Sequence, residues 1–166
     1  KEYRRQRQMC IRDSVKGPML AHKAEEEGVA VAERIAGRKA VTHIERVPSV
    51  VYTEPEIAWV GKTEDELKNA GKPYKVGVFP FMANGRARAV GETQGFVKML
   101  ADAETDLVLG LHIIGPQAGE LIAQGCDALS FGATAEDLAL ICDPHPTFSE
   151  AIKEAALAVN KEGINF

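Results

Sequence analysis

Residues 95–115, GFVKMLADAETDLVLGLHIIG, hold two apolar runs on either side of the turn-forming tetrapeptide AETD at 103–106. Alternate positions of the second run are apolar, at Leu107, Leu109, Leu111 and Ile113. Because side chains alternate between the two faces of a strand, these four residues are expected to face the core together. The stretch therefore predicts two paired β-strands joined by a short turn.

Shorter β-type runs precede this pair, at residues 49–53, 57–61 and 74–81. Pro80 cannot donate a hydrogen bond to a strand ladder, so it predicts an edge strand or a bulge in the last of these runs. Between the runs, the polar segment 62–71 carries Thr63 and Glu66 at the spacing of a capping box and ends in glycine. These features predict a short helix.

The last third of the chain has helical patterns at residues 118–132, 134–142 and 149–159. Strands followed by helices indicate an α+β fold, a mainly antiparallel sheet with helices packed on one face. One more helix is expected earlier, at 17–37, where Pro18 suits the first turn and Gly37 the end. Residues 1–12 are interpreted as a tail, and residues 38–47 as a crossover from the early helix into the sheet.

The size and charge of the chain narrow the classes of protein to consider. Its 166 residues, 45% hydrophobic and 27% charged, suit one ordinary globular domain with a real core. The net charge of −4 gives no electrostatic reason to expect a nucleic-acid partner. No apolar run reaches the roughly 20 residues of a membrane-spanning helix, and no motif predicts a bound metal. Three histidines are expected to be surface, loop and strand residues: His22, His43 and His112.

The segment DPHPTFSE, residues 143–150, is the strongest candidate for chemistry. Two prolines restrict the backbone around His145, and Glu150 follows within reach of one ring nitrogen. A positioned imidazole of this kind suits general acid–base catalysis near neutral pH. The same residues also support a structural interpretation, because Thr147 and Glu150 have capping-box spacing at the start of the last helix. The two interpretations are compatible, because one carboxylate can serve both purposes.

Several motifs identify a family. They are GPMLAHKAEEEG (17–28), PSVVYTEPEIAWVGKT (48–63), FPFMANGRARA (79–89), LGLHIIGPQAGELI (109–122) and HPTFSEAIKEAALAV (145–159). Together they resemble the carboxy-terminal part of the dihydrolipoamide (dihydrolipoyl) dehydrogenases, in the pyridine nucleotide-disulfide oxidoreductase family. The resemblance implies that residues 39–166 form the dimerisation domain, in which His145 is the acid/base of the partner subunit's active site and Glu150 orients it.

The resemblance also implies partners and cofactors. It implies a homodimer that oxidises dihydrolipoamide carried by the acyltransferase of a 2-oxoacid dehydrogenase complex, with electrons passing through a redox disulfide and FAD to NAD. Residues 13–38 would end an FAD-binding domain. Flavin contacts are then expected at Asp13, Met19, Leu20, Ala21 and His22, with the positive end of the helix dipole directed at the flavin.

Some parts of such an enzyme have no counterpart among the motifs of this chain. The NAD site and the redox disulfide are expected outside this chain, which is interpreted as a fragment that is inactive alone. Many such enzymes have a histidine where this chain has Asp143, which changes the local charge. Two other interpretations stand beside the main one: a non-catalytic dimerisation or scaffold module, and a sister disulfide reductase such as glutathione reductase. Bacterial cytoplasm is the expected compartment, with the mitochondrial matrix as the alternative.

Overall fold

A computed structural model describes residues 17–165 of the chain. The chain divides into two compact units, Lys1–Val47 and Pro48–Phe166. In the first unit, helix α2 (Ala21–Ile35) is followed by the 3₁₀ turn η2 (Ile44–Arg46). The early helix is therefore present, although it begins after Pro18 and ends before Gly37.

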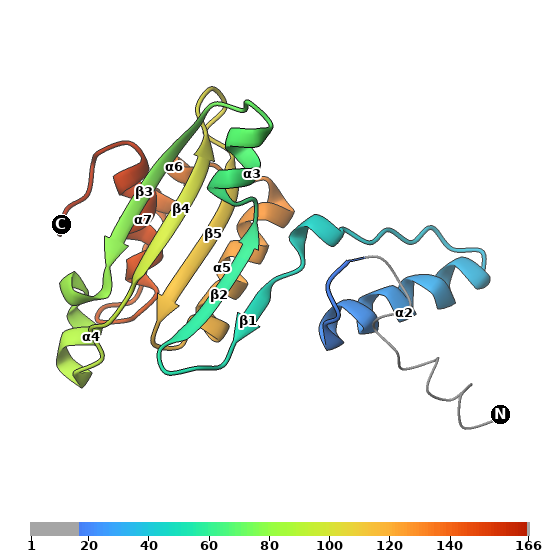
Figure 1. The fold of residues 1–166 in the computed structure, drawn as a ribbon, viewed down its shortest axis with the longest axis horizontal. Coiled ribbons are helices and arrows are strands. Elements are labelled where there is room, and N and C mark those ends of the chain that lie inside the picture. The colour runs from blue at the N-terminus through green and yellow to red at the C-terminus, as the bar shows by residue number, and fades with distance from the viewer. Residues whose placement is uncertain (1–16, 166) are drawn as a thin grey trace. The chain divides into compact units, whose positions relative to one another are not determined.

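The second unit is built on a five-stranded antiparallel sheet with the strand order β1-β2-β5-β4-β3 (Figure 1). The strands are β1 (Ser49–Val51), β2 (Glu56–Gly61), β3 (Tyr74–Pro80), β4 (Phe96–Asp102) and β5 (Val108–Gly115). The predicted pair is β4 and β5, which lie inside the sheet. Pro80 ends β3 at the sheet edge, where a missing N–H costs little. The antiparallel α+β prediction is confirmed.

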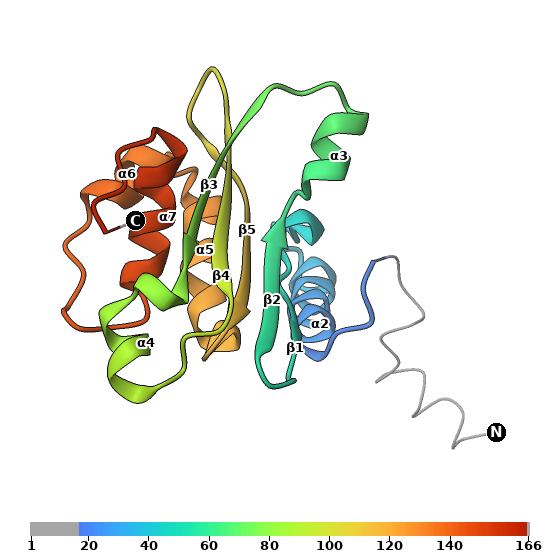
Figure 2. The same cartoon turned by 60° about the vertical axis from the view of Figure 1, so that its left-hand side comes forward.

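Three helices cover one face of this sheet: α5 (Ala118–Phe131), α6 (Ala135–Leu140) and α7 (Glu150–Val159). Helix α5 packs on β2 and β5, α7 packs on β3 and β4, and α6 packs on α7. Figure 2 shows these helices on one side of the sheet and α3 (Glu64–Asn69) on the other. The capping box predicted for α3 is present, because Thr63 and Glu66 exchange hydrogen bonds with each other's backbone N–H.

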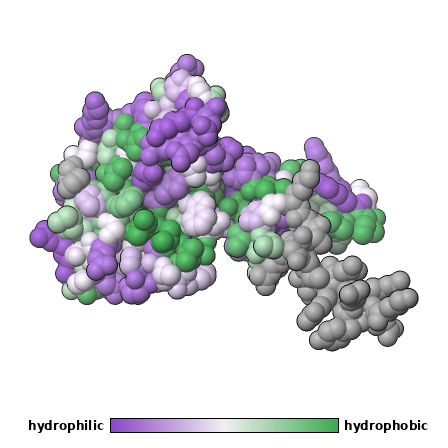
Figure 3. Space-filling model, in the orientation of Figure 1, coloured by the Kyte–Doolittle hydropathy of each residue, from purple (hydrophilic) through white to green (hydrophobic). Residues whose placement is uncertain are grey.

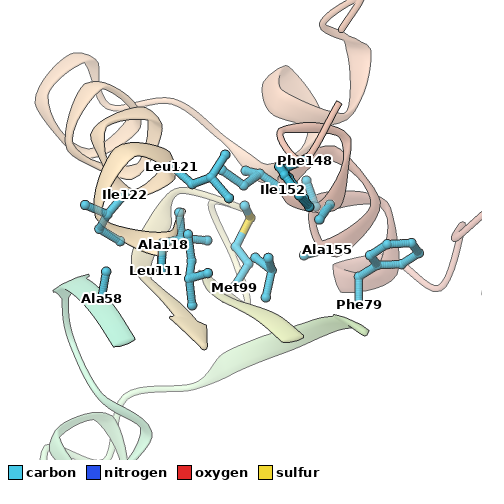
Figure 4. Close-up of a cluster of buried hydrophobic side chains, with 14 of the residues drawn as sticks. Ala58, Phe79, Met99, Leu111, Ala118, Leu121, Ile122, Phe148, Ile152 and Ala155 are labelled. Carbon is cyan, nitrogen blue, oxygen red and sulfur yellow. The ribbon is translucent and has the colours of Figure 1, made fainter. Parts of the chain in front are cut away.

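The hydrophobic core lies between the sheet and the α5–α7 layer (Figure 4). Met99 and Leu111 from the strands meet Ile122 of α5 and Ile152 of α7 there, all nearly without exposure to solvent. Helix α7 approaches β3 closely at Gly77, where an added Cβ would lie 2.0 Å from the carbonyl oxygen of Ala155. A side chain at residue 77 would push α7 away from the sheet.

The prediction for the core face of β5 is only half right. Leu111 and Ile113 are buried, but Leu107 precedes the strand with 39% of its surface exposed, and Leu109 is only partly buried. The reason is an irregularity in the β4–β5 ladder: Leu100 pairs with Gly110, while Ala101 pairs with Val108. The shift changes which side chains face inward, so Val108 joins the core in place of Leu109.

The sheet face opposite α5–α7 carries a mixture of apolar and charged side chains (Figure 3). On this face His112 of β5 lies in register between Trp59 of β2 and Lys98 of β4. The Lys98 Nζ donates to Glu64 of α3 at 3.0 Å, which ties α3 to the sheet. His112 lies in β5, which confirms the strand position predicted for it. Both of its ring nitrogens are shielded from solvent.

The buried imidazole of His112 is expected to make stability depend on pH. Burial, reinforced by the Lys98 ammonium, lowers the pKa of His112, although Glu64 and Glu66 of α3 favour its charged form. In the unfolded chain the ring takes up a proton near pH 6.5, so stability is lost as the pH falls below about 6.5. Urea unfolding should show a steeper fall in the free energy of unfolding between about pH 7 and about pH 5 for the parent chain than for His112→Leu. Equal slopes would contradict the expectation.

Candidate active site

The segment before α7 is held against the core by an aromatic pair. Phe148 is buried, and its ring meets the fully buried Phe81 edge-to-face, with centroids 6.1 Å apart and an interplanar angle of 77°. Phe81 begins the 3₁₀ turn η3 (Phe81–Ala83), which directly follows the edge strand β3. Edge-to-face pairs of this kind add stability beyond the area they bury. The pair therefore fixes the loop that carries His145.

The structure brings His145 and Glu150 together, as their spacing predicted. Glu150 Oε1 lies 2.8 Å from His145 Nδ1, and Glu150 Oε2 accepts a hydrogen bond from the Thr147 backbone N–H, also at 2.8 Å. One carboxylate thus serves both the imidazole and the loop backbone. Because Glu150 is the first residue of α7, its carboxylate is fixed at the end of a helix packed on the sheet.

The capping box expected at Thr147 and Glu150 is only half formed. Glu150 makes its half by accepting from the Thr147 N–H. The Thr147 hydroxyl instead donates to the Pro144 carbonyl at 2.7 Å and lies 2.8 Å from the Ser149 hydroxyl. Ser149, not Thr147, is the N-cap of α7, and it makes no side-chain cap hydrogen bond. The tight turn around Pro146 draws the threonine oxygen back into the loop.

The electrostatics favour an ionised carboxylate beside the ring. Burial on its own would raise the pKa of Glu150, but hydrogen bonds from the Thr147 N–H and from His145 outweigh it and lower the pKa. An ionised Glu150 can only accept, so His145 Nδ1 carries a proton, and in the neutral ring Nε2 is the nitrogen with the lone pair. The histidine side chain is 74% exposed. An imidazole held by a carboxylate at Nδ1 is therefore exposed at the surface of the described residues.

A further polar residue, Asn84, was missed in the sequence. It is 3% exposed and lies at the N-cap of α4 (Gly85–Val90), a helix that the sequence pattern did not predict. Its Oδ1 accepts from the Ala87 N–H at 2.9 Å, and its Nδ2 donates to the Thr147 carbonyl at 3.0 Å. A pocket of about 190 Å³ beside His145 is lined in part by Asn84, Arg88 and Glu154. Asparagine before a short polar run is the signal that could have revealed the cap.

Asp143, at the start of the same segment, has an altered acidity. Burial raises its pKa, and the negative Glu150 acts in the same direction, whereas the Lys153 ammonium opposes it. Lys153 itself donates to the Ile141 carbonyl at 2.7 Å, which anchors the end of the α6 segment to α7. A second carboxyl group thus lies near the Glu150–His145 pair, held less acidic than a free aspartate.

The residues expected to contact flavin lie at the start of α2, where the structure describes them. Met19 and Leu20 precede the helix, and Ala21 and His22 begin it; Asp13 lies outside the described residues. Leu20, the N-cap, makes no side-chain cap hydrogen bond, and the first turn holds no acidic residue. An uncapped helix start of this kind suits an electron-rich group, so these residues fit the negatively charged edge of a reduced flavin.

Within residues 17–165, no three histidine, cysteine, aspartate or glutamate side chains are grouped to hold a metal ion. Over the same residues, every helix is too short or too polar to cross a membrane.

Comparison with known protein families assigns most of the second unit. Residues 47–156 match the family described as pyridine nucleotide-disulphide oxidoreductase, dimerisation domain. The chain belongs to this family. The match contains both His145 and Glu150 and four of the five motifs quoted above in whole or in large part.

Individual members of the disulphide oxidoreductase family extend the match beyond this domain. The dihydrolipoyl dehydrogenase of Cupriavidus necator is 60% identical over 94% of this chain, and the dihydrolipoamide dehydrogenase of Chaetomium thermophilum is 57% identical over 95%. The solved structure of LpdA from Mycobacterium tuberculosis aligns with a TM-score of 0.78, at 29% identity over 82% of this chain and 30% of that one. The chain spans about a third of the length of these relatives, 33% and 31% for the two enzymes.

Proposed function

We propose that this chain supplies the dimerisation domain and the acid/base pair of a dihydrolipoyl dehydrogenase. The observation that carries the proposal is the 2.8 Å contact between Glu150 and Nδ1 of an imidazole whose side chain is 74% exposed. A histidine needed only for a turn does not require a partly buried carboxylate on one nitrogen while most of its side chain faces solvent. The identity to enzymes named dihydrolipoyl dehydrogenase supports this choice over a glutathione reductase or a scaffold module.

In the proposed reaction His145 handles a proton and Glu150 stabilises the charge that results. Nε2 takes the proton from one thiol of dihydrolipoamide, and the thiolate then attacks the redox disulfide of the partner subunit. Glu150 holds the Nδ1–H tautomer and stabilises the imidazolium that forms. In the reverse direction the same imidazolium returns its proton to the departing thiolate.

The cofactors would be bound mainly by parts of the enzyme outside this chain. The α2 start, at Met19, Leu20, Ala21 and His22, would contact FAD, together with Asp13, as the end of an FAD-binding domain over residues 13–38. When bound, FAD would accept the electron pair from the reduced redox disulfide and pass it to NAD. The chain has no GxGxxG fingerprint for a dinucleotide, so NAD would be held elsewhere in the subunit.

The partners proposed for the enzyme are a second copy and a lipoyl-bearing protein. A histidine that serves the other subunit requires a two-fold, isologous interface. The proposed dimerisation domain, residues 39–166, leaves apolar side chains exposed on and beside helices α5 and α6, at Phe131, Leu140 and Ile141. Exposed apolar side chains of this kind suit such an interface. Dihydrolipoamide would arrive on the acyltransferase of a 2-oxoacid dehydrogenase complex. We place the enzyme in a bacterial cytoplasm, because the 60% identical relative is bacterial. The alternative is the mitochondrial matrix, since a 57% identical relative from Caenorhabditis elegans is named mitochondrial.

A complementation experiment tests whether His145 acts on the partner subunit. A chimera is made in which this chain replaces the matching third of the Cupriavidus necator enzyme, and two inactive versions are co-expressed: one with His145→Gln, the other lacking its redox cysteines. A mixed dimer then contains one site with both an intact disulfide and an intact histidine. Random association should restore roughly a quarter of the parent activity, because half of the dimers are mixed and each has one working site. No recovery in isolated mixed dimers would contradict the proposal.

A further inference from the structure

We propose that Asn84 is a positioning residue for the His145–Glu150 pair and acts through Thr147. The inference rests on the proposed function, in which His145 Nε2 moves a proton at a fixed place. It assigns Asn84 a role in turnover that a helix cap alone does not have.

The hydrogen bonds of Thr147 carry the inference. Its carbonyl accepts from Asn84 Nδ2 at 3.0 Å, and its N–H donates to Glu150 Oε2 at 2.8 Å. The other oxygen of that carboxylate meets His145 Nδ1. A continuous path therefore runs from a buried amide, through the covalent backbone of Thr147 and the Glu150 carboxylate, to the imidazole.

The buried amide of Asn84 makes hydrogen bonds with both its oxygen and its nitrogen. An N-cap requires only an acceptor, and Thr63 and Thr134 supply hydroxyl caps elsewhere in this chain. Asn84 offers the same acceptor to the Ala87 N–H and adds a donor that a hydroxyl at this position is too short to place on Thr147. At 3% exposure, a donor left unpaired here would lose its hydrogen bonds to water without replacement, so the bond to Thr147 is strongly favoured.

The first turn of α4 also forms a wall beside the imidazole. A Cβ at Gly85 would lie 3.7 Å from His145 Cε1, which is ordinary van der Waals contact. Asn84 therefore fixes both the α4 start, through Ala87, and the loop that carries the ring, through Thr147. Losing its donor would leave the α4 start in place and remove one of the contacts that hold the loop at Thr147.

The test separates these two functions of Asn84 with two substitutions. Serine and ionised aspartate both keep an acceptor for the Ala87 N–H, but Asn84→Ser cannot reach Thr147 and Asn84→Asp offers it no donor. In the chimeric enzyme we expect both variants to oxidise dihydrolipoamide about tenfold more slowly in kcat, a part of the 10²–10⁴-fold that a general base contributes. Electron transfer from NADH to an artificial acceptor that bypasses the dithiol should be unchanged. The control, Thr134→Ala, removes the cap of α6 and should leave both rates unchanged.

A second readout does not depend on turnover. Nitrogen-15 NMR of histidine in the 166-residue chain should show His145 as the Nδ1–H tautomer in the parent and as a mixture of tautomers in Asn84→Ser and Asn84→Asp. Unchanged dihydrolipoamide turnover together with an unchanged tautomer in both variants would overturn the inference. That result would leave the proposed function standing, because the latter depends on His145→Gln and on complementation.

Discussion

Replacing His145 with glutamine is expected to lower dihydrolipoamide turnover of the chimeric enzyme by at least about 10²-fold, which is the lower end of what a general base contributes. Glutamine can still hydrogen-bond to Glu150, but it cannot take a proton from a thiol at neutral pH. Because the loop is held by Phe148 and Thr147 and not by the ring, the fold, the dimer and the FAD content should be retained. Steady-state kinetics with dihydrolipoamide, paired with thermal unfolding, measures both quantities.

Two comparisons make this result specific to the base. Glu150→Gln should reduce turnover less than His145→Gln, because an amide oxygen still accepts from Nδ1 but no longer stabilises the imidazolium. Transfer from NADH to an acceptor that bypasses the dithiol should survive both changes. If His145→Gln left dithiol turnover intact and lowered only the melting temperature, the histidine would be a structural turn residue.

Phe81→Ala is expected to cause the largest loss of stability among single substitutions at the site. The side chain has no exposed surface and packs edge-to-face on Phe148. Truncating a buried phenylalanine costs about 3–5 kcal/mol, since transfer energy is lost and a cavity remains. Folded domains are stable by only about 5–15 kcal/mol, so a large share of the stability would disappear. Urea unfolding of the 166-residue chain gives the free energy of unfolding directly.

The adjacent residue provides a matched control for Phe81. Met82 belongs to the same 3₁₀ turn but is 62% exposed, so Met82→Ala should change the free energy of unfolding by no more than about 0.5 kcal/mol. Equal effects of the two substitutions would mean that burial in η3 does not stabilise the loop. Because Phe148 lies in the His145 loop, Phe81→Ala should also slow dithiol turnover.

Most of the fold could be predicted because its signals are local. Two apolar runs joined by a turn, the second with alternating apolar residues, marked β4 and β5, and Thr63 with Glu66 marked the start of α3. The inward face of β5 could not be predicted, because the pairing shift next to Leu100 arises only when two strands meet. A period-two pattern contains no information about where such a shift falls.

The candidate site divides in the same way between local and distant signals. His145 and Glu150 are five residues apart across a restricted turn, so their contact could be inferred from sequence. Asn84 could not be linked to them, since its partner Thr147 lies 63 residues further along the chain. Helix α4 was missed because its six residues, GRARAV, show little apolar periodicity, and its start is held by the hydrogen bond that the Ala87 N–H donates to Asn84.

Because the Glu150 carboxylate binds both the Thr147 N–H and His145 Nδ1, hydrogen exchange at the Thr147 amide reports on the support of the imidazole. Every local opening that exposes the Thr147 N–H to solvent exchange must break its bond to Oε2 and so disturb the support of His145. The protection factor of this single amide therefore gives the fraction of time during which the Thr147–Glu150 bond is closed and the carboxylate is in place for the ring. Ligands or subunit contacts that slow its exchange would be expected to lengthen the periods in which the histidine is ready to react.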